Sequence, residues 1–202
     1  MAETTADTTV GTTVGTTVEI REMVEGDIDA VSGIRVAGWR WGYAGIVPAS
    51  YLDAMTVAED AVRRRAWFTH QQRRSLDLVA VDGGVPVGWI AARPGANGPD
   101  EPNGSGGSDG PGAGEVLALY LLPDRVGRGI GRALLAGAHT RLAERGCHRS
   151  ELWVIEENHR ARRFYERAGY RADGARRDDV YDGTALPEIR YRRSLGGAGS
   201  PN

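Results

Sequence analysis

The sequence predicts an α/β domain: one domain with a central mixed, mostly antiparallel twisted sheet of about seven strands, flanked by about four helices. Three observations predict it. Stretches that alternate apolar and polar residues lie between stretches of helical period. Hydrophobic residues make up 41% of the 202 residues, which is enough for one core. Turn signals rich in glycine and proline separate the stretches, and no internal repeat is visible.

The N-terminal elements are expected to be one strand and a group of helices. Alternation in "VEIREM" predicts a strand at 18–23. Residues 26–42 have helical period, with Asp27 as the expected cap. A turn, a short helix opened by Pro48 and a further helix at 58–72 follow. The apolar face of the longest of these helices carries Ile28, Val31, Ile34 and Gly38.

The middle of the chain predicts three strands. Leu76–Val81 and Val85–Ala92 flank "DGG", a hairpin signal. Residues 93–114 are almost all Gly, Pro, Ser, Asn and Asp, which predicts a flexible loop within the domain. The next strand is expected at Glu115–Leu121.

The C-terminal part alternates helices and strands. A helix at Gly127–Arg145, a strand at Ser150–Ile155 and a helix at Asn158–Ala168 are expected, and glycines follow both helices as C-terminal caps. From Tyr170 onward we expect a strand, the turn "YDGTALP" and a last strand "EIRYRR". The boundaries of the domain are then 18–193, with disordered tails at 1–17 and 194–202.

Composition excludes several classes of protein. The formal net charge of −2 gives no positive field for nucleic acid, although all 25 basic residues are arginine. Cys147 is the only cysteine, so no internal disulfide forms, which fits a reducing compartment. We expect a cytoplasmic protein without membrane contact, since no apolar run approaches ~20 residues and no signal peptide is visible. The four histidines show no metal-ligand pairing, so they are expected at the surface and no metal is predicted.

The stretch "RVGRGIGRALL" at 125–135 predicts an anion site. Glycines bare the main chain, the helix that follows leaves its first N–H groups unpaired, and the neighbouring arginines add positive charge. A plain strand-to-helix turn with solvated arginines is the alternative. A P-loop would need a lysine, which the chain lacks, and a dinucleotide fingerprint would need glycine where Arg132 stands.

A second informative stretch, "ELWVIEENHRARRFYERAGYRADG", covers residues 151–174. Asn158 begins the expected helix, and Tyr165 lies two turns later on the same face. The small Ala161 lies between them and leaves room beside that face. The alternative is that Asn158 only caps the helix and Tyr165 only fills the core.

Together, these two stretches resemble the acetyl-CoA-binding core of the GCN5-related N-acetyltransferase (GNAT) superfamily. The likeness spans residues 18–193 and is most specific over 115–174. It implies that acetyl-CoA is the cosubstrate. Its pyrophosphate would bind the glycine-rich loop, and its pantetheine arm would lie along the preceding strand as an added strand. The implied cofactor-binding residues are Leu119, Leu121, Gly127, Arg128, Gly129, Ile130, Gly131, Arg132 and Asn158. Val126 departs from the Gln or Arg usual there, for which Arg125 or Arg128 is expected to compensate.

The resemblance also implies catalytic roles. Tyr165 resembles the general acid that protonates the leaving thiolate, and the N–H of Leu121 would stabilise the oxyanion. Glu115, four residues before Leu119 and expected on the same strand face, resembles the general base of some members. An edge residue with no catalytic role is the alternative. Glu156 and Glu157, with Asp178 and Asp179 as weaker candidates, are rivals for the role of base.

The expected reaction is transfer of an acetyl group to a primary amine by direct attack in a ternary complex. The acceptor, a small molecule or a peptide, would enter between the first two helices and the closing hairpin. The alternatives are a non-catalytic acyl-CoA sensor and an acyltransferase acting on a macromolecular amine, in a protein or an aminoacyl-tRNA. A homodimer is compatible with the resemblance. The aromatic residues that would suit an amine there are Trp39, Trp41, Tyr43, Tyr51, Tyr181 and Tyr191.

Overall fold

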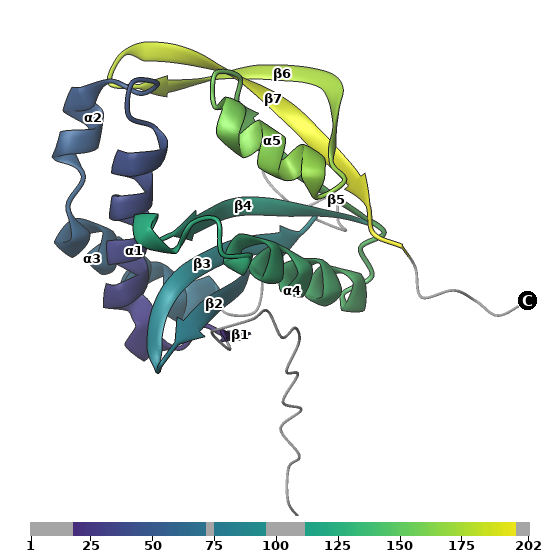
Figure 1. Ribbon diagram of the computed structural model, residues 1–202, viewed down its shortest axis with the longest axis horizontal. Coiled ribbons are helices and arrows are strands. Elements are labelled where there is room, and N and C mark those ends of the chain that lie inside the picture. The colour runs from purple at the N-terminus through teal and green to yellow at the C-terminus, as the bar shows by residue number, and fades with distance from the viewer. Residues whose placement is uncertain (1–17, 72–74, 96–111, 197–202) are drawn as a thin grey trace, which may run out of the picture.

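A computed structural model describes residues 18–71, 75–95 and 112–196 (Figure 1). The α-helices are α1 (Ile28–Gly42), α2 (Ala49–Ala54), α3 (Val57–Gln71), α4 (Ile130–Glu144) and α5 (His159–Arg167). The strands are β1 (Glu19–Glu22), β2 (Leu76–Asp82), β3 (Val85–Pro94), β4 (Ala113–Leu121), β5 (Arg149–Ile155), β6 (Arg171–Tyr181) and β7 (Thr184–Ser194). Two short 3₁₀ turns lie at Glu25–Asp27 and Pro123–Arg125.

The strands form one seven-stranded sheet in the order β1-β2-β3-β4-β5-β7-β6. Among the strands that the structure describes, β4 and β5 pair in parallel and every other pair is antiparallel. The predicted mixed, mostly antiparallel sheet in a single α/β domain is therefore confirmed.

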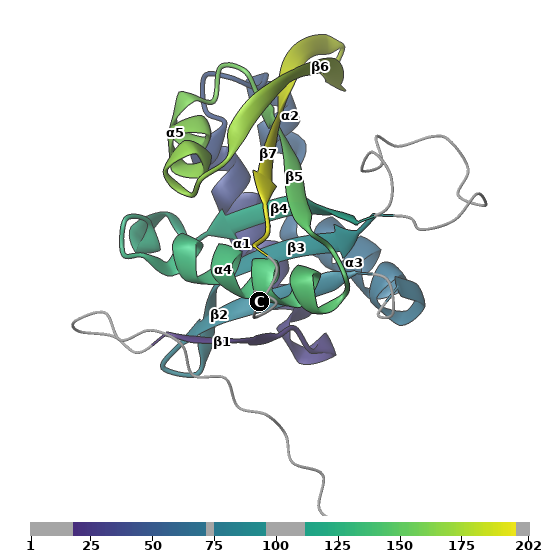
Figure 2. The ribbon, with the colours of Figure 1, turned by 90° about the vertical axis from the view of Figure 1, so that its right-hand side faces the viewer.

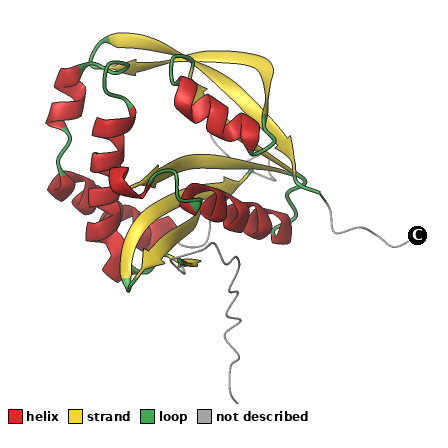
Figure 3. Ribbon diagram, in the orientation of Figure 1, coloured by secondary structure: helices red, strands yellow, loops and turns green. Residues whose placement is uncertain are grey.

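Helices cover both faces of the β1–β4 part of this sheet (Figures 2 and 3). On one face α4 packs its apolar side, including Leu134, Leu135 and Leu142, against β2 and β3. On the other face α1 packs against β3 and β4, and α3 packs against α1. The predicted apolar face of α1 is confirmed, because Ile28, Val31 and Ile34 are all buried.

The parallel pair β4–β5 is short, and this shapes the molecule. Pairing joins 113–115 to 149–151 and then stops. Beyond Glu115, the described residues of β4 pair with β3 alone. The remaining strands β5, β7 and β6 run at a steep angle to β4, with α5 beside them (Figure 2). The second half of β4 therefore has a free edge of backbone N–H and C=O groups.

Several predicted boundaries are corrected by backbone geometry. The helix expected at Gly127–Arg145 begins only at Ile130, because Gly127 and Gly129 both have φ of +83°. The turn before β7 is two residues long, Asp182 with φ of 49° and Gly183 with φ of 78°, so the strand begins before the predicted "EIRYRR".

The ends of α1 and of β7 also differ from expectation. Asp27 occupies the N-cap position of α1, as expected, but its side chain makes no capping hydrogen bond to this helix. Its carboxylate accepts hydrogen bonds from Arg21 and from the backbone N–H of Val24. At the C-terminus, β7 continues to Ser194 and the side chain of Leu195 is buried, so the ordered chain extends past the predicted end. The tail at 1–17, most of the 93–114 loop and residues 197–202 lie outside the described residues.

A buried hydrogen-bond chain links α4 to the sheet. The Tyr170 hydroxyl lies 2.7 Å from Nε2 of His139 and 2.6 Å from Oγ of Ser150. Burial lowers the pKa of His139 to about 4, and the positive charge of Arg193 adds to that effect. His139 is therefore neutral at pH 7 and packed against the sheet, which corrects the expectation of a surface residue, whereas His148 and His159 are exposed as expected.

Acid should destabilise the protein through His139. The unfolded chain takes up this proton below about pH 6.5, and the folded protein does so only near pH 4, so the free energy of unfolding falls between these values. Between pH 7 and 5 the wild type should lose about 2 kcal/mol more than His139→Gln. Denaturant unfolding at several pH values measures the difference. His148→Gln keeps His139 and should lose as much as the wild type; an identical profile for His139→Gln would contradict the assignment.

Candidate active site

A cleft of about 210 Å³ opens where β5 leaves β4. Its walls are the free edge of β4, the C-terminal part of α1, the start of α4 and one face of α5. Five residues predicted from the sequence to act at one site line it together: Leu119, Leu121, Gly131, Asn158 and Tyr165. Segments far apart in the sequence thus meet around one cavity.

The glycine-rich loop lies at the start of α4. Gly129 is the N-terminal cap residue of this helix in a left-handed conformation, which L side chains rarely adopt. Gly131 is buried, and a Cβ there would meet Phe164 at 3.5 Å and Leu121 at 3.6 Å. The backbone at Gly131 is therefore close to α5 and β4, whereas Gly127 and Gly129 have open space around them. The first N–H groups of a helix lie at the positive end of its dipole.

The arginines of this loop differ in their surroundings. Arg125, expected to contact phosphate, instead pairs with Asp82 and lies 3.4 Å from Asp124. Arg128 and Arg132 are exposed, and neither forms an ion pair with any residue that the structure describes. Arg128 is thus better placed than Arg125 to supply the side-chain contact to phosphate that Val126 cannot make.

On α5, Asn158 and Tyr165 occupy the same face, as predicted. Oδ1 of Asn158 accepts a hydrogen bond from the N–H of Ala161 at 3.0 Å, so this residue caps the helix. Within the described chain its amide nitrogen donates to no protein atom, so the amide can also face a ligand in the cleft. Capping and ligand contact are compatible here.

Tyr165 combines burial with an unengaged hydroxyl. Its ring packs edge-on against Phe164 and Tyr170, with centroid distances of 5.1 and 5.7 Å. Its hydroxyl makes no hydrogen bond to any residue in the described ranges, and the residue lines the cleft. Burial raises the pKa of Tyr165, and the neighbouring phenols Tyr43 and Tyr170 raise it further. The phenol is therefore neutral at physiological pH and holds a proton that faces the cavity.

Glu115 lies near the cleft but not on the predicted face. Ala91 pairs with Ala118 and Ala92 with Val116, so Leu117 is an extra residue, a β-bulge. Val116 and Leu119 consequently lie on the same face, in the core beneath α4, whereas Ala118 lies in the core beneath α1 and α3. Because neighbouring side chains alternate, Glu115 faces away from Leu119, and the expectation that they share a face is wrong.

The Glu115 carboxylate is buried and paired. Nε and Nη2 of Arg93 lie 3.1 and 2.8 Å from its Oε2. Burial raises the pKa of Glu115, and the hydrogen bonds and charge of Arg93 oppose that rise. A raised pKa makes this carboxylate a stronger base than an ordinary glutamate.

The rival carboxylates lie elsewhere. Glu156 is bound by Arg176 through two hydrogen bonds of 2.8 and 2.9 Å, and Glu157 is exposed. Asp178 is exposed on β6, and Asp179 accepts a hydrogen bond from the Tyr181 hydroxyl. None of the four lines the cleft, and neither does Glu115, whose neighbour Val116 does.

Most of the aromatic residues expected to bind an amine pack against one another instead. The Trp39 ring lies 4.5 to 5.8 Å from those of Tyr43, Tyr51 and Tyr181, and together they form part of a buried core. Tyr191 is also buried. Trp41 and Tyr43 nevertheless line the cleft.

Two features at the cleft were not predicted from the sequence. The Arg160 guanidinium stacks 3.4 Å from the ring centroid of Trp41, and both residues line the mouth of the cleft. Arg93, which pairs with Glu115, lies at the edge of the segment predicted to be a loop. The first is a contact between helices far apart in the sequence, and the second depends on strand register, so neither leaves a local sequence signal.

No group of three or more His, Cys, Asp or Glu side chains in the described ranges is placed to hold a metal ion. No helix in the part of the chain that the structure describes is long and apolar enough to cross a membrane.

Comparisons with known proteins agree with this geometry. Residues 42–170 match the model of the acetyltransferase (GNAT) family. An uncharacterized N-acetyltransferase, YuaI of Bacillus subtilis, is 31% identical over 70% of this chain and 73% of its own. Spermidine N(1)-acetyltransferase of Thermoplasma acidophilum is 23% identical over 77% of this chain and 89% of its own.

A solved structure shares the fold. PaiA N-acetyltransferase from Thermoplasma acidophilum, in complex with coenzyme A, superposes with a TM-score of 0.66 at 21% identity, covering 88% of this chain and 98% of its own. Strands β4 and β5 separate after three paired residues, and a glycine-rich loop begins α4. These features agree with the family match. The chain belongs to the GNAT acetyltransferase family and is an acyltransferase.

Proposed function

We propose that this protein transfers an acetyl group from acetyl-CoA to a primary amine by direct attack in a ternary complex. The observation that carries the proposal is the neutral Tyr165 phenol, whose unengaged hydroxyl lies in a cleft bounded by the free edge of β4. A module that only binds acyl-CoA would need no such proton donor. Release of free thiol in the presence of amines tests the proposal against a non-catalytic sensor of acyl-CoA.

The cleft fits coenzyme A in two ways. The unpaired edge of β4 at Leu119 and Leu121 offers main-chain groups for the amides of the pantetheine arm. The amides of 127–132, at a helix start, offer donors for the pyrophosphate, supported by the charges of Arg128 and Arg132. The amide of Asn158 supplies a further contact from α5.

The chemistry requires a neutral amine, an oxyanion site and a proton for the leaving group. The amine nitrogen attacks the thioester carbonyl, the C–N bond forms and the C–S bond breaks. The N–H of Leu121 stabilises the negative oxygen. Tyr165 gives its proton to the departing sulfur, and solvent restores it. The apolar surroundings that raise the pKa of the phenol also disfavour a free thiolate, so proton transfer accompanies C–S cleavage.

Glu115 is the base in this proposal. It takes the proton that the amine loses, directly or through one water, and Arg93 holds its carboxylate in place. Its position on the face of β4 opposite Leu119 is compatible with this role, because the acceptor then approaches from the side away from the coenzyme.

A small amine is the favoured acceptor class. One relative is named as a spermidine acetyltransferase, which supports small molecules over macromolecules. The net charge of −2 argues against an aminoacyl-tRNA.

Tyr165→Phe should lower kcat by about 100-fold or more, because the leaving thiolate loses its proton donor. The KM for acetyl-CoA should change little, since the ring and its packing remain. Steady-state thiol release measures both. Tyr51→Phe, which removes a hydroxyl in the aromatic core outside the cleft, should keep wild-type turnover. Equal activity of Tyr165→Phe and wild type would exclude the acid role.

Gly129→Val should weaken coenzyme A binding by about tenfold or more, because the branched side chain shields the loop amides from the pyrophosphate. Gly146→Val is the matched control. Both glycines have φ of +83° and open space around the missing Cβ, so both variants carry similar backbone strain. Calorimetric titration should show the loss for position 129 alone; equal losses would mean that strain, not the site, is responsible.

Glu115→Gln should lower kcat by about 10²-fold and change the pH profile. In the wild type, activity rises with pH as Glu115 loses its proton, and its raised pKa moves this rise above the range of an ordinary carboxyl. The variant has no carboxyl to titrate, so the rise should vanish. If Glu115 serves only as an ion-pair partner, the pH profile of the variant will match that of the wild type.

A further inference from the structure

A second, larger cavity of about 620 Å³ lies on the side of the sheet away from α4. It is bounded by α3, the end of β1 and the faces of β2, β3 and β4. Its walls combine aromatic and basic side chains, chiefly Trp67, Phe68, Trp89, Arg35, Arg63 and Arg64. The cavity has no part in coenzyme binding as proposed above.

This cavity meets the acyl-transfer cleft at the β-bulge. Leu117 and Ala118 line both of them. Ala91 and Ala118, which line the large cavity, form a strand pair, and one further pair separates them from the pair of Arg93 and Glu115. The bulge places Glu115 on this face, so the proposed base and the cavity lie on the same side of β4. An amine bound in the cavity therefore lies on the same side of β4 as Glu115.

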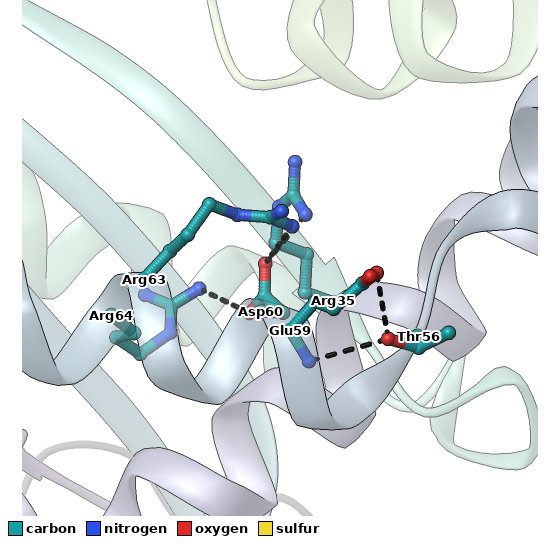
Figure 4. Close-up of polar contacts among 6 residues, drawn as sticks. All are labelled: Arg35, Thr56, Glu59, Asp60, Arg63 and Arg64. Atoms are coloured by element: carbon teal, nitrogen blue, oxygen red, sulfur yellow. Dashed lines mark hydrogen bonds and ion pairs between the residues drawn. The ribbon is translucent and has the colours of Figure 1, made fainter.

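Three arginines of the cavity gather around one buried carboxylate, that of Asp60 (Figure 4). Nη1 of Arg35 lies 2.7 Å from Oδ1, and Nη2 of Arg64 lies 3.3 Å from Oδ2. Arg63 is more distant, at 3.9 Å, and 63% of its side chain is exposed. Asp60 holds the first two guanidinium groups closely, whereas the more distant and largely exposed guanidinium of Arg63 can also contact an anion in the cavity.

The charges of the cavity do not cancel. Four arginines and three carboxylates line it, so one positive charge is uncompensated. Asp77 is already engaged, since it accepts a hydrogen bond of 2.9 Å from Nε1 of Trp89. The guanidinium of Arg64 stacks 4.2 Å from the ring centroid of Trp89, and its Nε is buried without a hydrogen-bond partner in the described residues. A forked donor fixed in this way suits a carboxylate.

We propose that this cavity is the acceptor site and that it selects a small amine bearing a carboxylate and an apolar or aromatic side chain, the chemistry of an α-amino acid. The proposal rests on the acetyl transfer proposed above. The arginines bind the carboxylate, the aromatic walls take the side chain, and the amine faces the bulge between Glu115 and the cleft. A polyamine has no anionic group for these arginines and is repelled by them.

Matched pairs of amines test the selection, because each pair differs only in the carboxylate. L-phenylalanine with 2-phenylethylamine, L-leucine with isoamylamine and L-tryptophan with tryptamine are suitable, with spermidine as the polycation. Thiol release should give a kcat/KM about tenfold or more higher for the amino acid of at least one pair, and spermidine should be poorer than that amino acid. A preference for the decarboxylated amines, or for spermidine, would overturn the proposal.

Variants on α3 test whether the preference for a carboxylate arises in this cavity. Arg63→Gln should lower kcat/KM about five- to tenfold for the preferred amino acid and leave its decarboxylated partner unchanged. Arg65→Gln removes a charge from the same helix outside the cavity and should keep the preference. Loss of the preference in both variants would point to general electrostatics and overturn the assignment of the site.

Direct binding separates this inference from the proposed function. Calorimetric titration of the same amino acids into the protein, without acetyl-CoA, should show binding that Arg63→Gln weakens. If amino acids bind in this way but no amine is acetylated, the cavity assignment holds and the proposed transfer fails. If amines are acetylated without a carboxylate preference and without Arg63-dependent binding, the transfer holds and the cavity assignment fails.

Discussion

The early end of pairing between β4 and β5 is the constraint on which the site depends. Three residues of each strand pair, and then β5 turns away to join β7. The separation leaves main-chain groups of β4 unpaired, and it makes room for α5 to bring Tyr165 and Asn158 to the same cleft. Unpaired backbone groups are costly when buried, so such an edge is suited to a ligand that pairs as a strand.

The bulge at Leu117 changes which face of the sheet the side chains of β4 occupy. By adding one residue, it reverses the alternation of side chains between Val116 and Ala118. Leu119 then contributes to the side of α4, while Glu115 faces the side of α1 and α3. One strand thereby has unpaired main-chain groups at one edge and a buried carboxylate on the face opposite Leu119. In the proposed reaction, the two substrates would therefore approach from different sides.

Burial sets the protonation of the groups at this site. Burial raises the pKa of Tyr165, which keeps the phenol protonated. Burial also raises the pKa of Glu115, which makes its carboxylate a stronger base. In the proposed reaction, the two groups serve as proton donor and proton acceptor. In the neighbouring cavity, the buried Asp60 lies among arginines, and its ion pairs with Arg35 and Arg64 fix their guanidinium groups in place.

The sequence by itself determined the order of elements, the mixed sheet, the glycine-rich loop and the pair Asn158 and Tyr165. These depend on local signals: strand alternation, helical period, and glycines where the backbone needs a positive φ. Only the tertiary structure decided the face of Glu115, its pairing with Arg93, the closed packing around Trp39 and the arginine-lined cavity beneath α3. Each of these depends on strand register or on contacts between residues far apart in the chain, which no local pattern encodes.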